Sequence, residues 1–334
     1  FKPGLSITEF LDWDVVKGAF RLDLLTSIQK HIHKYFKHPR IRQLLEFPVL
    51  FLGALPENTP ALYSLMNYAD IVGGTWYPEG GMYSVVDGMY RLAKELGVVF
   101  HFNQQVQSIE ISANKAKAVL TQNGRYDADV VIGGADYHFI ESNLLPPTHR
   151  SYSEAYWESR LMAPSCILYY VGINKRIPSA SHHMLFFDVP FELHAREIYT
   201  TRQWPTEPLF YVSASSVTDP SVAPGGCENL VFLIPVAAGL SDDSESVREK
   251  YFSLIMDRFE KHVGENIREH IVYKRSFAYT DFLNTYNSFK GNAYGLANTL
   301  MQTAIFRPSC DISRLTFLLD CLSIRTIGWV GGVL

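Results

Sequence analysis

Two glycine-rich segments are the parts of this sequence whose residue types could hold a flat cofactor. Gly80 and Gly81 follow Pro78, and a backbone without Cβ atoms can approach a planar ring closely. Residues 133–136 read Gly-Gly-Ala-Asp at the end of a strand-like run, which is where α/β sheets bind ligands. A tight turn also needs small residues, so an ordinary loop is the alternative for both segments.

Two histidine pairs raise the question of a metal site. They are His31 with His33, and His182 with His183. Residues two apart on a helix point to different faces, and adjacent residues on a strand point to opposite faces. No acidic or cysteine partner is placed to complete a ligand shell, so a metal site is not expected.

Other catalytic signatures are absent from the sequence. It contains no Gly-x-Ser-x-Gly, no Walker loop and no His-Glu-x-x-His, which argues against serine hydrolases, P-loop NTPases and zincins. No side chain can be named as a general base. The chemistry is therefore expected to be that of a cofactor.

Composition narrows the class of protein further. The chain has 334 residues, of which 47% are hydrophobic, and a net charge of −4, which predicts a globular protein of about two domains. No basic block with interleaved aromatics predicts nucleic-acid binding. The four cysteines lack Cys-x-x-Cys spacing, which favours a reduced, cytoplasmic compartment. No apolar run reaches the roughly 18 residues of a membrane span.

The first half of the chain has the element order of a nucleotide-binding flavoprotein. Hydrophobic spacing predicts a helix over 7–43, interrupted by prolines, and a second helix over 83–96 that ends at Gly97. Strands are predicted at 98–103, 106–111, 117–120 and 126–132. Asn123-Gly124 marks a hairpin between the last two strands.

The second half reads as a sheet with flanking helices. Strands are predicted at 166–173, 184–187, 209–213, 230–236 and 270–277, and helices at 244–263 and 293–306. We interpret residues 151–310 as a substrate domain.

A basic region stands apart from the acidic remainder of the chain. Residues 13–42 carry a net charge of +5 and include Trp13, Phe20, Tyr35 and Phe36. Aromatics beside cations suit a lipid headgroup interface. The alternative is a solvated helix face.

Several stretches of sequence resemble bacterial-type phytoene desaturases, members of the larger FAD-dependent amine-oxidase-like superfamily. The resemblance covers about residues 1–310. It is carried by Lys37-His38-Pro39-Arg40, the segment 53–63, Gly74-Thr75-Trp76-Tyr77-Pro78 with Gly80-Gly81-Met82, the segment 129–138, and the tyrosine- and glycine-rich segment 291–300.

This resemblance implies an FAD enzyme of carotenoid biosynthesis that desaturates phytoene or a related precursor, with hydride transfer to the flavin. Its partners would be a long-chain polyene and, peripherally, a membrane; the electron acceptor is not indicated. By the same resemblance Gly80 and Gly81 match the loop near the flavin ring. Val106 matches a backbone contact to the adenine, and Ala135 and Asp136 match the strand end near the flavin nucleotide.

The resemblance also implies a mixed α/β (α+β) fold with a partial FAD-binding domain of Rossmann-like type. We divide the chain into a helical, basic region that is a candidate for membrane or substrate contact (1–70), the C-terminal part of the FAD-binding domain (71–150), the substrate domain (151–310) and an atypical tail (311–334). The family's Gly-x-Gly-x-x-Gly turn does not occur, and residues 315–334 contain no proline. We therefore expect a fragment that by itself neither retains FAD nor desaturates phytoene.

Two other functions fit the same residues. A carotenoid isomerase or related polyene-modifying flavoenzyme would share the scaffold, and product analysis on phytoene would separate it from a desaturase. A catalytically inactive polyene- or lipid-binding module is the alternative outside enzymes.

Overall fold

The computed structural model describes residues 26–52, 55–297, 299, 302, 308, 312 and 315–317. Within them the chain forms a five-stranded antiparallel sheet, a three-stranded antiparallel sheet and a short parallel strand pair, with helices around them. The predicted mixed α/β class is confirmed. Trp13 and Phe20 lie outside the described residues.

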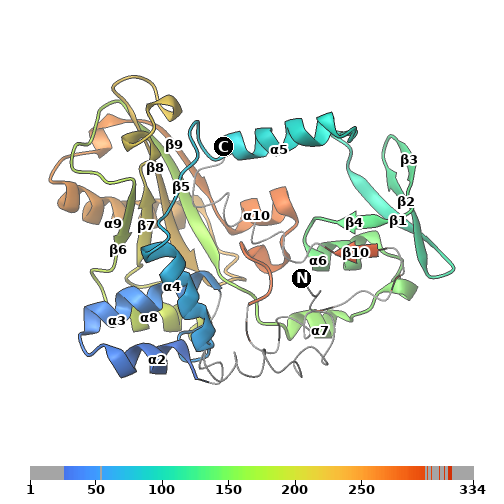
Figure 1. The fold of residues 1–334 in the computed structure, drawn as a ribbon, viewed down its shortest axis with the longest axis horizontal. Helices are drawn as coiled ribbons and strands as arrows, with labels where there is room; N and C mark the ends of the chain where they lie inside the picture. Colours follow the sequence, from blue (N-terminus) through green and yellow to red (C-terminus); the bar gives the residue numbers. More distant parts are fainter. Residues whose placement is uncertain are drawn as a thin grey trace.

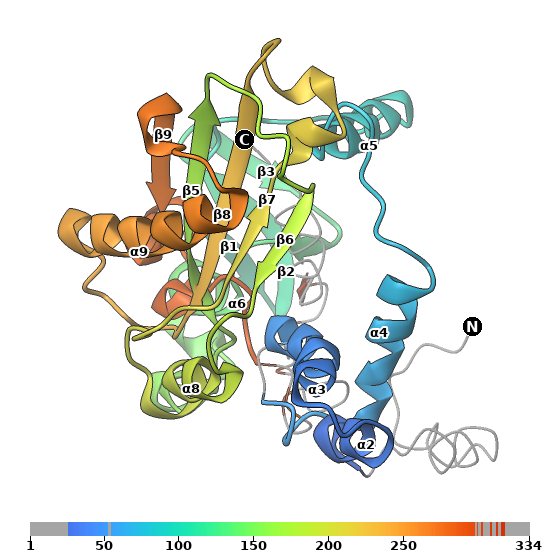
Figure 2. The same cartoon turned by 90° about the vertical axis from the view of Figure 1, so that its left-hand side faces the viewer.

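The five-stranded sheet is the framework of the second half of the chain. Its order is β6-β7-β8-β5-β9, made of β6 (His183–Phe186), β7 (Phe210–Ser213), β8 (Glu228–Val236), β5 (Ser165–Ile173) and β9 (Ile271–Phe277). Helix α9 (Glu245–Val263) covers one face of the sheet (Figures 1 and 2). Tyr169 and Val171 of β5 pack in the core beneath α9, whereas Cys166 and Leu168 belong to a separate cluster. These positions follow the strand's alternation of side chains.

Helix α10 (Tyr279–Tyr286) was not predicted from the sequence, and it follows β9 directly. Phe282 of this helix packs edge to face on Phe277, with ring centroids 4.9 Å apart. The predicted helix over 293–306 is wrong over its described start. Ala293 donates its N–H to the Pro164 carbonyl at 3.2 Å and Ala297 to the Leu161 carbonyl at 2.9 Å. These bonds to another segment take the place of a helical ladder, and residues 293–295 form a bend in which the φ of Gly295 is +83°.

The predicted β-meander forms the three-stranded sheet. It consists of β1 (Val106–Ser112), β2 (Lys115–Thr121) and β3 (Gly124–Asp127) in sequential order. The predicted strand over 126–132 is wrong as a single strand, because β4 (Val131–Gly133) leaves the meander. It pairs in parallel with β10 (Leu315–Phe317), so these three residues of the proposed tail belong to this unit.

Helix α5 (Tyr83–Glu95) spans from the five-stranded sheet to the meander (Figure 1). It ends as predicted at Gly97, whose φ is +87°. The strand predicted at 98–103 is wrong. No strand in the described part of the chain pairs with these residues, and Phe100 instead packs on Tyr90, with ring centroids 4.6 Å apart. Without a ladder partner, a hydrophobic run of this length forms no strand.

The helical N-terminal region is broken into α2 (Ile28–Tyr35), α3 (Pro39–Glu46) and α4 (Ser64–Ile71). Pro39 occupies the first turn of α3, where a backbone N–H would have no acceptor within the helix, so the lack of an N–H on proline costs no hydrogen bond. His33 pairs with the buried Glu46 at 2.7 Å and so joins α2 to α3. The remaining helices are α6 (Tyr137–Phe139), α7 (Glu154–Glu158) and α8 (Phe191–Arg196).

Candidate functional site

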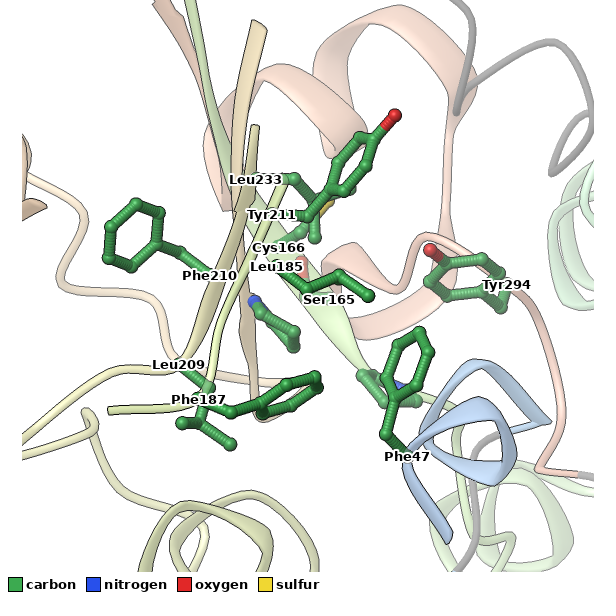
Figure 3. Close-up of a pocket in the computed structure, with 12 residues that line it drawn as sticks. Phe47, Ser165, Cys166, Leu185, Phe187, Leu209, Phe210, Tyr211, Leu233 and Tyr294 are labelled. Atoms are coloured by element: carbon green, nitrogen blue, oxygen red, sulfur yellow. The ribbon is translucent and has the colours of Figure 1, made fainter. Parts of the chain in front are cut away.

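An apolar pocket lies against the face of the five-stranded sheet that α9 leaves uncovered (Figure 3). It has an empty volume of about 490 Å³, part of which is open to solvent. The strands β5 to β8 form one wall, and two segments distant in sequence complete it. Its lining is Phe47, Pro164, Ser165, Cys166, Leu185, Phe187, Leu209, Phe210, Tyr211, Leu233, Pro235 and Tyr294.

Aromatic side chains close one end of this pocket. Phe47 follows the last residue of α3 and meets Phe187, with ring centroids 5.1 Å apart at 61°. This edge-to-face contact is favourable for two aromatic rings. The helical N-terminal region therefore contributes directly to the pocket wall.

The polar atoms in the pocket wall are few and largely neutral. Ser165 donates its hydroxyl to the Gly291 carbonyl at 2.5 Å. Burial raises the pKa of the Cys166 thiol and of the Tyr294 hydroxyl far above their usual values. A pocket of this character favours a long apolar ligand over a charged one.

Tyr211 and His183 form a polar pair at the other end. The Tyr211 ring lies across the pocket from Phe47 and Phe187, and its hydroxyl points away from both of them (Figure 3). The hydroxyl is 2.5 Å from Nδ1 of His183 on the neighbouring strand. Desolvation raises the pKa of Tyr211 to about 12, so the phenol is neutral at physiological pH.

His182 connects this polar pair to the glycine loop. Its ring packs edge to face on Tyr77 at 4.6 Å, and its Nδ1 is 2.6 Å from the Thr218 hydroxyl. Burial lowers the pKa of His182 to about 4. The adjacent imidazoles thus have different hydrogen-bond partners, although their rings lie only 4.2 Å apart. His182 precedes β6 and does not follow the alternation expected of two strand residues. Within the described ranges no cluster of metal-ligating side chains occurs.

The Gly80-Gly81 loop is fixed beside this end of the pocket. The φ angles are +81° and +88°, a conformation that favours glycine. The Gly80 N–H donates to Asp219 at 2.9 Å. A Cβ on Gly81 would come within 3.3 Å of Val222. Hydrogen bonds led by the Ser221 hydroxyl lower the pKa of Asp219, which keeps it an anionic acceptor for the loop.

Asp136 is a buried junction between the two halves of the molecule. It caps α6 by accepting the Phe139 N–H at 3.1 Å, and it accepts the Phe289 N–H at 3.2 Å. Burial raises its pKa, although these hydrogen bonds act in the opposite direction. Asp136 thereby ties the end of β4 to the segment around Asn292.

The other two predicted cofactor contacts lie in the meander unit. Val106 opens β1 and packs against that unit's own core. Ala135 is exposed at the end of β4. The structure therefore brings Gly80 and Gly81 to the polar end of the pocket, whereas Val106 and Ala135 belong to a separate unit joined to it through α5 (Figure 1).

The end of β4 fits a flavin nucleotide. Gly134 is exposed, and a Cβ added there would meet no atom within 4 Å. Val130 and Ile132 are 56% and 59% exposed beside it. Small residues with open space and apolar neighbours can accept a flat ring system, so the residues present fit the group that the resemblance implies.

Sequence reasoning missed most of the pocket. It singled out His183 only as half of a histidine pair, and it passed over Tyr211, Leu185 and Tyr294. The alternation within the strands at 184–187 and 209–213 groups the side chains by face. Nothing in the sequence says which face lies under α9.

The sequence of this chain is similar to those of known carotenoid-modifying enzymes. A carotenoid 3,4-desaturase of Haloarcula japonica is 38% identical over 327 residues, covering 97% of this chain and 65% of the relative. A zeta-carotene-forming phytoene desaturase of Myxococcus xanthus is 28% identical, covering 93% of this chain and 60% of the relative. The chain thus spans less than two thirds of these relatives.

Solved structures of low sequence identity share the fold. The crystal structure of an oxidoreductase from Methanosarcina mazei matches with a TM-score of 0.61 and 15% identity, covering 95% of this chain and 68% of that one. The family model for flavin containing amine oxidoreductases matches residues 19–316. Because this match takes in most of the sequence, the chain belongs to the flavin containing amine oxidoreductases.

Proposed function

We propose that this chain is the substrate-handling part, with a portion of the flavin-binding part, of an FAD-dependent carotenoid desaturase. Phytoene or a related polyene precursor is its substrate, and a new C=C bond is its product. The observation that carries the proposal is the apolar pocket of about 490 Å³ whose polar end adjoins the Gly80-Gly81 loop. The names of the carotenoid-modifying relatives support this substrate class.

In such an enzyme, different residues of this chain contact the cofactor, hold the polyene and position the glycine loop. FAD, when bound, supplies the acceptor for a hydride from a substrate C–H bond. Gly80, Gly81, Ala135, Asp136 and Val106 are the residues proposed to contact it. The aliphatic and aromatic walls hold the polyene and exclude water. Asp219 keeps the glycine loop in place through its bond to the Gly80 N–H.

Filling the pocket tests this proposal. Leu185 lines the pocket on edge strand β6, and Leu185→Trp places an indole in the space that a polyene would need. We expect at least a tenfold loss of phytoene affinity, measured by titration of the polyene's absorbance, because overfilling a site costs about 1–3 kcal/mol. Val272→Trp is the matched control, since Val272 is an exposed aliphatic residue on the opposite edge strand β9.

The two variants give a clear decision. Wild-type affinity in Leu185→Trp would contradict the location of the polyene site. In the holoenzyme, products with longer conjugation indicate desaturation, and products changed only in double-bond geometry contradict it. We also propose that the isolated 334-residue chain retains little FAD; a near-stoichiometric flavin spectrum of the purified chain would contradict this.

We further propose that the helical region collects the polyene from a membrane. Lys30, Lys34 and Lys37 are exposed on and beside α2, next to the exposed rings of Tyr35 and Phe36. Helix α3 then leads directly into the pocket wall. Among the described residues no helix is long and apolar enough to cross a bilayer.

Reversing the charge of this surface tests the membrane contact. Each basic residue near an anionic leaflet contributes about 1 kcal/mol. The triple change of Lys30, Lys34 and Lys37 to glutamate should therefore lower binding to phosphatidylserine liposomes at least tenfold at low salt. The same change at Lys94, Lys115 and Lys117 is the control. Equal co-sedimentation of the two triple variants would identify α2 as a solvated face.

A further inference from the structure

Desaturation of a polyene requires a proton acceptor as well as a hydride acceptor. Two hydrogens leave adjacent carbons, one with its electron pair as hydride and the other as a proton. The electrons of the second C–H bond form the new C=C bond. This inference rests on the proposed function. A side chain must receive the substrate proton, although the pocket wall is almost entirely apolar.

The described pocket lining has four side chains with polar atoms, and three of them have no base attached. The Ser165 hydroxyl is bound to the Gly291 carbonyl. Cys166 is a fully buried thiol held neutral by desolvation. Tyr294 lies beside another tyrosine, Tyr199, whose hydroxyl is also kept protonated by burial. None of these three groups is shown bonded to a basic side chain that could accept its proton.

Tyr211 is the exception because its hydroxyl meets an imidazole. The 2.5 Å distance to Nδ1 of His183 is that of a short hydrogen bond. The Tyr211 ring reaches the pocket, and His183 is exposed at edge strand β6, where water is available. The pair therefore connects the apolar interior to solvent across two adjacent strands.

We propose that Tyr211 is the proton acceptor of the reaction and that His183 is its positioning and relay residue. The substrate proton passes to the Tyr211 oxygen while the hydroxyl's own proton moves to Nδ1 of His183. FAD, when bound, would accept the hydride with its electron pair and so balance the two-electron oxidation of the substrate. The resulting imidazolium then releases a proton to water, so that tyrosine and histidine both return to their starting states.

The groups around His183 suit this role. Desolvation against its neighbours lowers the pKa of His183, so it is neutral and ready to accept a proton. The carboxylate of Asp70 acts in the other direction and stabilises the imidazolium once it forms. The facing groups are the neutral imidazole of His182 and, beyond it, the anionic Asp219.

Nitrogen NMR of the flavin-free chain tests the pair independently of activity. With side-chain-labelled histidine, assigned through His183→Gln, the neutral His183 ring should carry its proton on Nε2 and leave Nδ1 as acceptor for Tyr211. A ring protonated mainly on Nδ1 overturns the proposal, because that atom then has no place for the tyrosine's proton.

Kinetics of the flavin-loaded holoenzyme test the proton transfer itself. Tyr211→Phe should lower the rate of flavin reduction by phytoene at least about 100-fold, the usual contribution of a general base, with phytoene Kd changed less than about twofold. His183→Ala should lose a similar factor and regain part of it with added imidazole. Tyr251→Phe is the matched control, because it removes a buried hydroxyl bonded to the Pro205 carbonyl on the α9 side of the sheet.

The results distinguish failure of the Tyr211–His183 relay from failure of the proposed desaturase function. A wild-type rate in Tyr211→Phe, or no rescue of His183→Ala by imidazole, overturns the relay while leaving the polyene site intact. Failure of the wild-type protein to bind phytoene contradicts the proposed function instead. The NMR result then still decides whether the pair is arranged to share a proton.

Discussion

Asp136→Ala is expected to lower the free energy of unfolding by about 3–5 kcal/mol, because it leaves buried N–H groups without an acceptor. The carboxylate accepts the Phe139 N–H at 3.1 Å and the Phe289 N–H at 3.2 Å, and it is 8% exposed. One side chain therefore satisfies donors from two elements that are 150 residues apart in sequence. Urea denaturation, followed by circular dichroism, measures the effect.

Asp136→Asn is the control for the loss of charge alone. Its amide oxygen still accepts hydrogen bonds, so we expect a cost of about 1–2 kcal/mol. Stability of Asp136→Ala equal to wild type would mean that the junction between β4 and the segment around Phe289 is not a coupled structure.

The Asp136 carboxyl group should also make the stability of the fold depend on pH. Burial raises the pKa of Asp136 above its usual 3.8. The folded state then binds more protons than the unfolded state between these two pKa values. This contribution is fully present below the unfolded pKa and is lost as pH rises through the folded pKa. The stability advantage of wild type over Asp136→Asn should therefore be largest at acidic pH and shrink as the pH rises through the folded-state pKa of Asp136.

Gly291→Ala is expected to lower the free energy of unfolding by about 4 kcal/mol. Single substitutions cause so large a loss only through severe effects such as a steric clash or backbone strain. An added Cβ would lie 2.3 Å from Cδ2 of Tyr279, and the φ of Gly291 is +59°. The three atoms nearest to this Cβ all belong to the Tyr279 ring, so the whole ring or the backbone must shift to make room. Thermal and urea unfolding of the purified variant measure the loss.

Two further variants separate the clash from the backbone strain. Gly264 ends α9 with φ at +75°, yet a Cβ there would meet nothing within 4 Å. Gly264→Ala should therefore cost only about 1 kcal/mol, the penalty of the left-handed conformation. Adding Tyr279→Ala to Gly291→Ala should recover part of the loss. Equal costs for Gly291→Ala and Gly264→Ala would show that the chain relaxes around the added methyl group.

The local pattern of the sequence determined most of the elements. The five strands from residue 165 to 277 and the helix α9 follow hydrophobic alternation and the placement of caps, because burial of one face imposes a period of two or 3.6 residues. Helix α8 in the same range was not predicted. Gly97 ends α5 and Asn123-Gly124 turns the hairpin for local steric reasons. The family resemblance also came from sequence, and the match to residues 19–316 confirms it.

The tertiary structure decided what local patterns leave open. The run at 98–103 has strand composition but pairs with no strand among the described residues. The segment starting at Ala293 is held in a non-helical conformation by hydrogen bonds to Pro164 and Leu161. Strands and helices alike depend on which hydrogen-bond partner is available, and distant residues supply it.

The pocket depended most on the tertiary structure. Phe47, Tyr211 and Tyr294 meet there from three distant segments. His182 and His183 are adjacent in sequence, yet one turns to Tyr77 and the other to Tyr211. Strand alternation does not separate the two rings, because His182 precedes β6 and the ring centroids lie 4.2 Å apart. The packing of α9 on one face of the sheet determined which side remained open for a ligand.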